Sequence, residues 1–248
     1  MSLEQTLPGI GHMRARARRR IPRVAWEYLD SGTGEGEGVH RNRAAMQAVK
    51  LAPRFFVDAR EPELGTELFG RRWEAPFGVA PVGLQSLMWP GAELALARAA
   101  RRAGLPYTLS TVSGEVLEKV AEAAGDGFWF QLYAPRSEEI LEDLLSRAEA
   151  AGARVLAVTL DVPSSSRRER QKAAGVGMPP RITARLVWDV LTCPAWSWET
   201  LNRGAPRLAT LERYVPGGGF ADLAEFVGRE MSVAVTPELM ARLRARWK

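Results

Sequence analysis

The feature that most constrains the fold is an alternation of short apolar runs with longer helix-like runs between residues 77 and 160. Each apolar run is short enough for one buried strand, and the four cover Phe77–Pro81, Leu105–Leu109, Phe128–Leu132 and Val155–Leu160. The runs between them have amphipathic helical periodicity, and each ends near a glycine, as helices commonly do. This alternation predicts βαβ units and a parallel sheet.

The even spacing of the four predicted strands favours a (β/α)8 TIM barrel. A doubly wound sheet is the alternative, but no glycine-rich dinucleotide-binding sequence follows the first strand. A closed barrel of this kind has about eight strand–helix units. We therefore predict an α/β fold with an incomplete TIM barrel of about four βα units.

We expect a single domain over residues 1–248 that is truncated at its C-terminal end relative to a full barrel. Residues 163–232 are rich in Pro, Gly, Trp and Arg, and a long insertion after a barrel strand usually covers the active-site mouth. The expected segments are N-terminal helices in 1–60, a hairpin in 61–76, strands 1–4 with their helices in 77–162, a long active-site loop in 163–232 and a helix in 233–248.

Composition excludes several classes of protein. The chain has 248 residues, 46% hydrophobic and 25% charged, which excludes collagen-like and wholly disordered chains. The single cysteine, Cys193, excludes a disulfide framework and the usual cysteine zinc sites, and we expect no metal. The net charge is +5, and the dense run Arg14–Arg23 is interpreted as a solvated helix face, so we expect no nucleic-acid partner.

Neither a secretory signal nor a run of about 18 apolar residues is present in the sequence. We therefore expect a cytoplasmic protein.

Polar residues stand at the ends of the predicted strands, where ligands of parallel α/β sheets bind. Ser110 and Thr111 end the second strand, Gln131 and Tyr133 the third, and Thr159 the fourth. Strand ends that reach solvent would explain any one of them. Gln131 and Thr159, however, lie inside apolar strands and need polar partners. A flat heteroaromatic ring with carbonyl and N–H edges would supply those partners.

Six motifs carry a family resemblance, and they are Trp26–Gly32, Ala80–Gln85, Thr108–Thr111, Trp129–Tyr133, Thr159–Asp161 and Arg167–Arg170. In their order and spacing the chain resembles the FMN-dependent α-hydroxy acid oxidase and dehydrogenase family, which includes glycolate oxidase, lactate dehydrogenase and mandelate dehydrogenase. Residues Leu186–Leu208 are most similar to the mandelate and lactate dehydrogenase branch.

The resemblance implies FMN as cofactor and the oxidation of an L-2-hydroxy acid, such as lactate or mandelate, to a 2-oxo acid. The implied FMN contacts are the backbone of Ala80, Pro81, Val82 and Gly83 and the side chains of Ser110, Gln131 and Thr159. The implied substrate-binding residues are Tyr28, Tyr133 and Arg168. Of these, Tyr28 and Arg168 would hold the carboxylate, with which a guanidinium forms a bidentate pair. A core position for Tyr28 and a solvated loop for Arg168 are the simpler alternatives.

The family's catalytic base is a histidine in its later half, but this sequence contains only His12 and His40, both before the first strand. No catalytic residue is therefore assigned, and we expect the chain to be inactive alone. The FMN phosphate site is also expected outside it. A non-catalytic or split half-barrel that acts through a partner chain is the alternative function. A phosphate-binding barrel without flavin is a third.

The resemblance further implies a homo-oligomer, commonly a tetramer. It also leaves open whether Trp188–Trp198 makes peripheral contact with the inner face of the cell membrane or forms a barrel lid.

Overall fold

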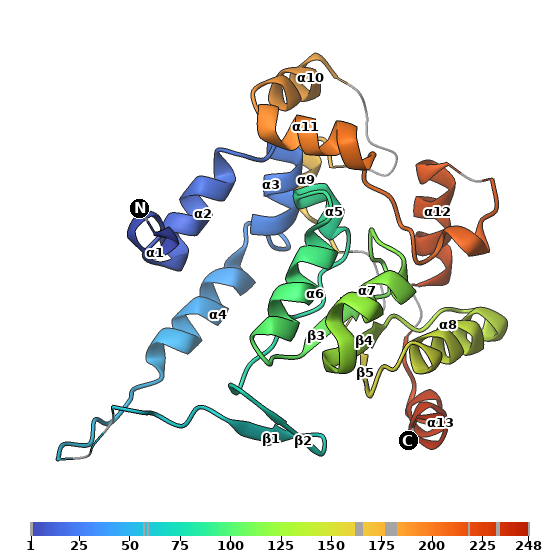
Figure 1. The fold of residues 1–248 in the computed structure, drawn as a ribbon. Coiled ribbons are helices and arrows are strands. Elements are labelled where there is room, and N and C mark those ends of the chain that lie inside the picture. Colours follow the sequence, from blue (N-terminus) through green and yellow to red (C-terminus); the bar gives the residue numbers. More distant parts are fainter. Residues whose placement is uncertain are drawn as a thin grey trace. The chain divides into compact units, whose positions relative to one another are not determined.

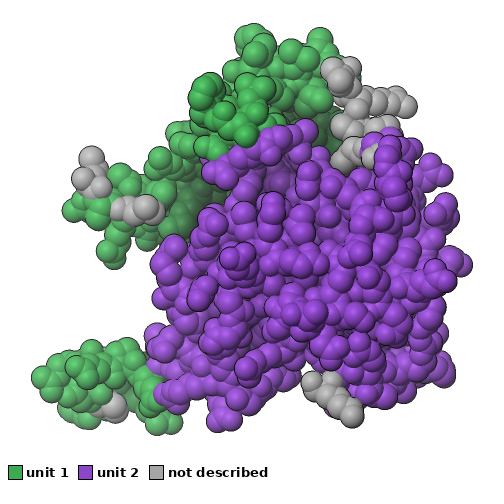
Figure 2. Space-filling model, turned by 45° about the vertical axis from the view of Figure 1, so that its right-hand side comes forward, with its two compact units in different colours: residues 1–63, 166–202 green, residues 64–165, 203–248 purple. Residues whose placement is uncertain are grey.

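A computed structural model describes residues 2–56, 58, 60–161, 166–176, 183–217, 219–231 and 234–247. The chain divides into two compact units (Figure 2). Met1–Glu63 and Ser166–Asn202 form the first, here called the helical unit, and Leu64–Ser165 and Arg203–Lys248 form the second, the sheet unit.

The helical unit is built from α1 Leu3–Thr6, α2 Ile10–Arg18, α3 Arg23–Asp30, α4 Glu37–Ala48, α9 Glu169–Ala173, α10 Ala184–Leu191 and α11 Pro194–Arg203, except that Arg203, the last residue of α11, is assigned to the sheet unit. Helix α3 follows Pro22, whose restricted φ suits a helix start, and it buries Val24, Ala25 and Trp26. Helix α10 is capped by Thr183, whose hydroxyl accepts a hydrogen bond from the Leu186 amide at 3.2 Å.

The sheet unit begins with an antiparallel hairpin, β1 Thr66–Leu68 and β2 Arg71–Trp73. Its parallel sheet has the order β3 Tyr107–Ser110, β4 Phe128–Leu132 and β5 Val155–Val158 (Figure 1). The helices and 3-10 turns of the unit are α5 Gln85–Met88, α6 Ala92–Arg102, α7 Leu117–Ala124, η1 Gly125–Gly127, α8 Glu138–Ala150, η2 Glu212–Tyr214, α12 Phe220–Glu230 and α13 Pro237–Arg246.

The first strand predicted from the sequence is much shorter in the structure. Within the described residues only an isolated parallel bridge joins Val79 to Tyr107. Pro81 has no N–H to donate to a ladder, which removes a hydrogen bond from this segment. Backbone contact is nevertheless close, because a Cβ on Gly78 would lie 2.5 Å from the Pro106 ring. The incomplete barrel therefore shows three strands and this bridge.

Alternation along the strands separates an apolar face from a polar one. Leu109, Phe128, Phe130 and Leu132 are almost fully buried. Helices α6 and α7 contact β3, and α8 contacts α7. The register pairs Ser110 with Gln131 and Gln131 with Ala157, so Ser110 and Gln131 share the opposite face.

The segment after β5 is more helical than the predicted long loop. It contains α9, α10, α11 and α12, whereas the sequence indicated only one helix-like piece near residues 182–191, of which residue 182 lies outside the described part.

Helix α13 lies beside α8 (Figure 1), and Arg246 forms ion pairs with Glu142 at 3.4 Å and Glu149 at 2.8 Å. Among the described residues, no helix has the length and hydropathy needed to span a bilayer.

Candidate active site

Three polar side chains from the ends of the parallel strands form a chain of hydrogen bonds in the sheet unit. The Ser110 hydroxyl donates to the Gln131 side-chain oxygen at 2.9 Å, and the Gln131 amide nitrogen donates to the Thr159 hydroxyl at 2.7 Å. Ser110 and Gln131 are each only 3% exposed. The structure therefore brings together the three side chains that the resemblance places at the polar edge of FMN.

The side chains of Gln131 and Thr159 keep donors and acceptors with which they could bind a ligand. A Gln side chain offers two N–H donors and a carbonyl with two lone pairs, and the bonds to Ser110 and Thr159 use one donor and one lone pair. The Thr159 hydroxyl accepts from Gln131 and keeps its own proton to donate. A planar ring with alternating carbonyl and N–H groups, such as the flavin of FMN, fits this set of donors and acceptors.

Thr111 supports the same strand ends, although the sequence did not single it out as a site residue. Its hydroxyl donates to the Gln131 backbone carbonyl at 2.6 Å and accepts from the Tyr133 amide at 3.0 Å. These two bonds fix the backbone at the end of β4, from Gln131 to Tyr133. The signal in the sequence was the second hydroxyl residue, next to Ser110, at the end of a predicted buried strand.

The backbone of Ala80–Gly83 runs from the bridge at Val79 towards Leu84. Leu84 is buried and has a positive φ of 52°, a conformation that few non-glycine residues adopt. Its amide donates to the Val112 carbonyl at 2.9 Å, just beyond β3. Ala80 and Pro81 are exposed, whereas Val82 and Gly83 are half-buried. The segment thus presents backbone near the carboxyl end of β3.

The other two predicted substrate residues, Tyr28 and Arg168, lie in the helical unit. Tyr28 is half-buried on α3, and its backbone carbonyl accepts a hydrogen bond from the Gln171 side chain on α9 at 3.3 Å. Arg168 is exposed immediately before α9, with its Nε donating to the Ser166 hydroxyl at 3.1 Å. Contacts between α3 and α9 therefore fix the backbone positions of Tyr28 and Arg168 within this unit.

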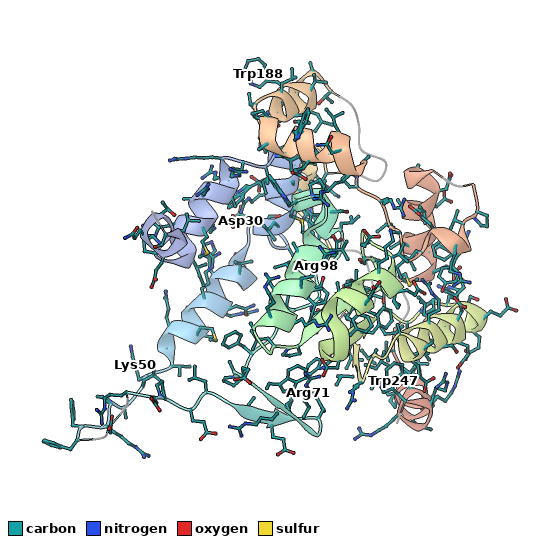
Figure 3. All side chains as sticks on the ribbon, in the orientation of Figure 1. Asp30, Lys50, Arg71, Arg98, Trp188 and Trp247 are labelled. Atoms are coloured by element: carbon teal, nitrogen blue, oxygen red, sulfur yellow. The ribbon has the colours of Figure 1, made fainter. Side chains whose placement is uncertain are left out.

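Ion pairs strengthen the packing of α3. Arg170 approaches Glu27 at 2.6 Å and Asp30 at 3.6 Å, while Arg14 forms a bidentate pair with Asp30 at 2.9 and 2.8 Å. Figure 3 labels Asp30 on α3. Burial opposes ionisation of Asp30, but Arg14 and Arg170 outweigh it and lower the pKa of this carboxyl.

Arg14, the first residue of the run Arg14–Arg23, is exposed on α2, as expected of a solvated helix face, and it also makes contacts with α3. Its guanidinium pairs with Asp30 and lies 5.3 Å from the centre of the Trp26 ring.

Both histidines lie in the helical unit, outside the strand ends. His12 is on α2 and His40 on α4, and both side chains are exposed. Within the part of the chain that the structure describes, no cluster of three or more His, Cys, Asp or Glu could hold a metal ion.

Comparison with known proteins identifies the relatives of this arrangement. The model of a family described as FMN-dependent dehydrogenase matches residues 17–248. (S)-Mandelate dehydrogenase from Pseudomonas putida is 31% identical over 245 residues, which are 99% of this chain and 62% of that protein. L-Lactate dehydrogenase from Caulobacter vibrioides is 38% identical over 216 residues, covering 87% of this chain and 56% of the relative.

A solved structure described as the monotopic membrane protein (S)-mandelate dehydrogenase matches with a TM-score of 0.92 and 32% identity. The match covers 98% of this chain and 65% of that one. The chain thus spans somewhat less than two thirds of the length of the relatives it matches. Because the family model covers nearly the whole chain, the chain belongs to the FMN-dependent dehydrogenase family.

Proposed function

We propose that this chain supplies the flavin-edge and carboxylate-binding residues of an FMN-dependent enzyme that oxidises an L-2-hydroxy acid to a 2-oxo acid. The observation that carries the proposal is the hydrogen-bonded series Ser110–Gln131–Thr159 at the ends of three parallel strands. Relatives named (S)-mandelate dehydrogenase and L-lactate dehydrogenase support an aromatic or small aliphatic hydroxy acid as substrate.

Ser110, Gln131 and Thr159 would hold the polar edge of the flavin, and the backbone of Ala80–Gly83 would lie against its ring. When bound, FMN supplies two-electron redox chemistry, and the protein contributes orientation and electrostatics. The substrate loses two electrons and two protons in becoming the oxo acid.

Arg168 and Tyr28 would bind the substrate carboxylate, and Tyr133 would contact the substrate from the end of β4. The exposed guanidinium of Arg168 can form a bidentate, charge-assisted pair with a carboxylate. Such a pair orients the α-carbon, and orientation of this kind lowers the barrier to reaction.

We also propose that the 248-residue chain alone turns over little or no substrate. Oxidation needs a base to take the hydroxyl proton. His12 and His40 are exposed on α2 and α4, before the parallel strands, whereas the resemblance implies a base in the later half of the family's sequence. The alternative proposal is a non-catalytic or split half-barrel that acts through a partner chain. The half-buried β5 and the exposed Leu160 that follows it favour such association.

The first experiment is a visible absorption titration of the purified chain with FMN, followed by anaerobic lactate or mandelate. We expect FMN to bind, with a perturbed flavin band, and to remain oxidised when substrate is added. Bleaching by substrate would contradict the missing base. Absence of FMN binding would contradict the flavin site. Light scattering of the same sample measures the oligomeric state and tests the half-barrel alternative.

A second proposal is peripheral contact with a membrane surface through α10 and α11. Their exposed apolar residues include Trp188 at 67%, Leu191 at 68% and Leu201 at 80%, and Figure 3 labels Trp188 on α10. A cleft of about 430 Å³ beside α10 is lined by the arginines Arg18, Arg19 and Arg23 and by the carboxyls of Glu27 and Asp189. Exposed apolar side chains in a unit whose cleft carries three arginines against two carboxyls suit an interface with anionic lipid.

Sedimentation with phosphatidylglycerol–phosphatidylcholine vesicles tests this contact. We expect the chain to pellet with vesicles, and the double variant Trp188→Ser, Leu191→Ser to remain in the supernatant. Ile10→Ser is the matched control, because Ile10 is an exposed apolar residue of the same unit outside α10 and α11. Equal binding of both variants would contradict the proposal.

A further inference from the structure

Glu93 is a carboxyl buried inside the sheet unit, at 1% exposure, on the first turn of α6. Its Oε1 accepts hydrogen bonds from two backbone amides, Ser86 at 3.2 Å and Gly114 at 3.0 Å. Ser86 belongs to α5, which follows the bridge at Val79, whereas Gly114 lies beyond β3. One oxygen therefore joins the segment that follows the Val79 bridge to the loop that follows β3.

The local sequence explains why an outside carboxyl is needed. Helix α5 begins after Leu84, and a leucine side chain has no oxygen with which to cap the first amides. Glu93 supplies an acceptor to this first turn from a neighbouring helix.

Packing around Glu93 leaves little freedom. A Cβ on Gly114 would lie 2.0 Å from the Ser86 hydroxyl and 2.9 Å from Glu93 Oε1, so this close approach of the loops requires glycine. The Tyr107 hydroxyl donates to the Gln85 side chain at 3.2 Å, and the Leu84 amide donates to the Val112 carbonyl at 2.9 Å. The first contact ties Gln85 to β3, and the second ties Leu84 to the loop beyond β3.

Burial of this carboxyl is costly. Burial raises the pKa of Glu93, and its second oxygen, Oε2, has no hydrogen-bond partner within the described residues. An unpaired buried polar atom disfavours folding. The carboxyl therefore opposes folding at one oxygen while it organises two loops at the other, as expected of a group whose role is to hold a geometry.

We propose that Glu93 is a positioning residue for the flavin site. Its carboxyl locks the loop Ala80–Ser86 to the loop Thr111–Gly114 and thereby fixes the backbone that faces FMN relative to Ser110. The inference rests on the proposed function, because it assigns FMN to these loops.

The test uses the full 248-residue chain with three variants. Glu93→Ala removes the acceptor oxygen, Glu93→Gln keeps an acceptor of the same reach, and Glu122→Gln changes an exposed carboxyl on α7 as a control. Amide hydrogen exchange resolved at Ser86 and Gly114 reports loop locking without FMN. Titration with FMN, followed by absorption, reports the flavin site.

In Glu93→Ala we expect exchange at Ser86 and Gly114 to rise at least about tenfold while the amides of β4 are unchanged, and the dissociation constant for FMN to rise by about tenfold. Glu93→Gln and Glu122→Gln should stay within about threefold of the unsubstituted chain in both measurements. Preserved β4 protection shows that the variant is folded.

Three outcomes would overturn the inference. Unchanged exchange at Ser86 and Gly114 in Glu93→Ala would show that the carboxyl does not lock the loops. If Glu93→Gln lost as much amide protection and FMN affinity as Glu93→Ala, the acceptor oxygen that Glu and Gln have in common would not be what locks the loops. Raised exchange with unchanged FMN affinity would separate the loops from the flavin site. Failure of the unsubstituted chain to bind FMN would instead overturn the proposed function, and the exchange data would still decide whether Glu93 holds the loops.

Discussion

Gln131 is the residue on which the arrangement at the strand ends depends, because its side chain links Ser110 to Thr159 while its backbone carbonyl accepts from Thr111. Gln131→Leu would leave two hydroxyl groups without their amide partner. We expect it to lower the free energy of unfolding by about 1–3 kcal/mol and to weaken FMN binding by at least about tenfold. Urea unfolding and FMN titration measure the two effects. The exposed Gln47→Leu is the control, and equal FMN affinity in Gln131→Leu would contradict the assignment.

Asp30 gives the helical unit a pH dependence with a definite sign. Its pKa in the folded chain is lowered from 3.8, since Arg14 and Arg170 outweigh the opposing effect of burial. Its contribution to stability is therefore complete well above pH 3.8 and is lost as the pH falls below that value. We expect Asp30→Asn to be less stable by about 1 kcal/mol at pH 7, with the difference vanishing in acid. Urea unfolding at several pH values measures this, and Glu35→Gln, an exposed carboxyl of the same unit, should show no such trend.

Elements with strong local signals were predictable from the sequence. Three of the four predicted parallel strands form, because Leu105–Leu109, Phe128–Leu132 and Val155–Leu160 are apolar runs between helices. The segment around Val79 forms only a bridge, since Pro81 has no N–H to donate to a longer ladder. Helices α9, α11 and α12 were missed, because α9 is only five residues long and Pro, Gly and Trp obscure the helical period around α11 and α12.

In the candidate site, too, residues with a local sequence signal could be predicted, whereas residues whose role depends on contacts between distant segments could not. Ser110, Gln131 and Thr159 could be selected because each stands at a recognisable strand end. Thr111 stands at the same strand end as Ser110, but neither its supporting role nor that of Glu93 could be read from the sequence, because their hydrogen bonds join segments about twenty residues apart and depend on how those segments pack. A buried carboxyl on a helix looks like any surface glutamate in the sequence.

Helix α13 offers a test at the scale of a single element. Thr236 accepts a hydrogen bond from the Leu239 amide at 3.2 Å, and Pro237 occupies the first turn. Removal of an N-cap hydroxyl costs about 1 kcal/mol. We expect Thr236→Ala to lower the free energy of unfolding by about that amount, while Thr236→Ser retains the cap and the stability. Urea unfolding followed by circular dichroism measures both variants, and similar losses in the two would contradict the capping role.

Stability should be distributed unevenly along the chain. Strands β3 and β4 carry residues that are almost fully buried, and their amides pair with neighbouring strands. Helices α2 and α4 bury no residues, so little apolar packing opposes their local opening. Regions with few buried apolar contacts open at lower free energy than core strands.

Hydrogen exchange across the full chain measures this distribution. We expect amides in β4 to be the slowest to exchange and amides in α4 to exchange at least about a hundredfold faster, which corresponds to about 2.7 kcal/mol. If the amides of α4 exchanged as slowly as those of β4, the expectation would be wrong. Contact with another copy of the chain or with a partner would then have to stabilise α4. The measurement is then repeated with FMN present. Bound FMN should slow the exchange of amides in Ala80–Ser86 and around Gln131 and leave the exchange of α4 unchanged, because the proposed flavin contacts lie in the sheet unit.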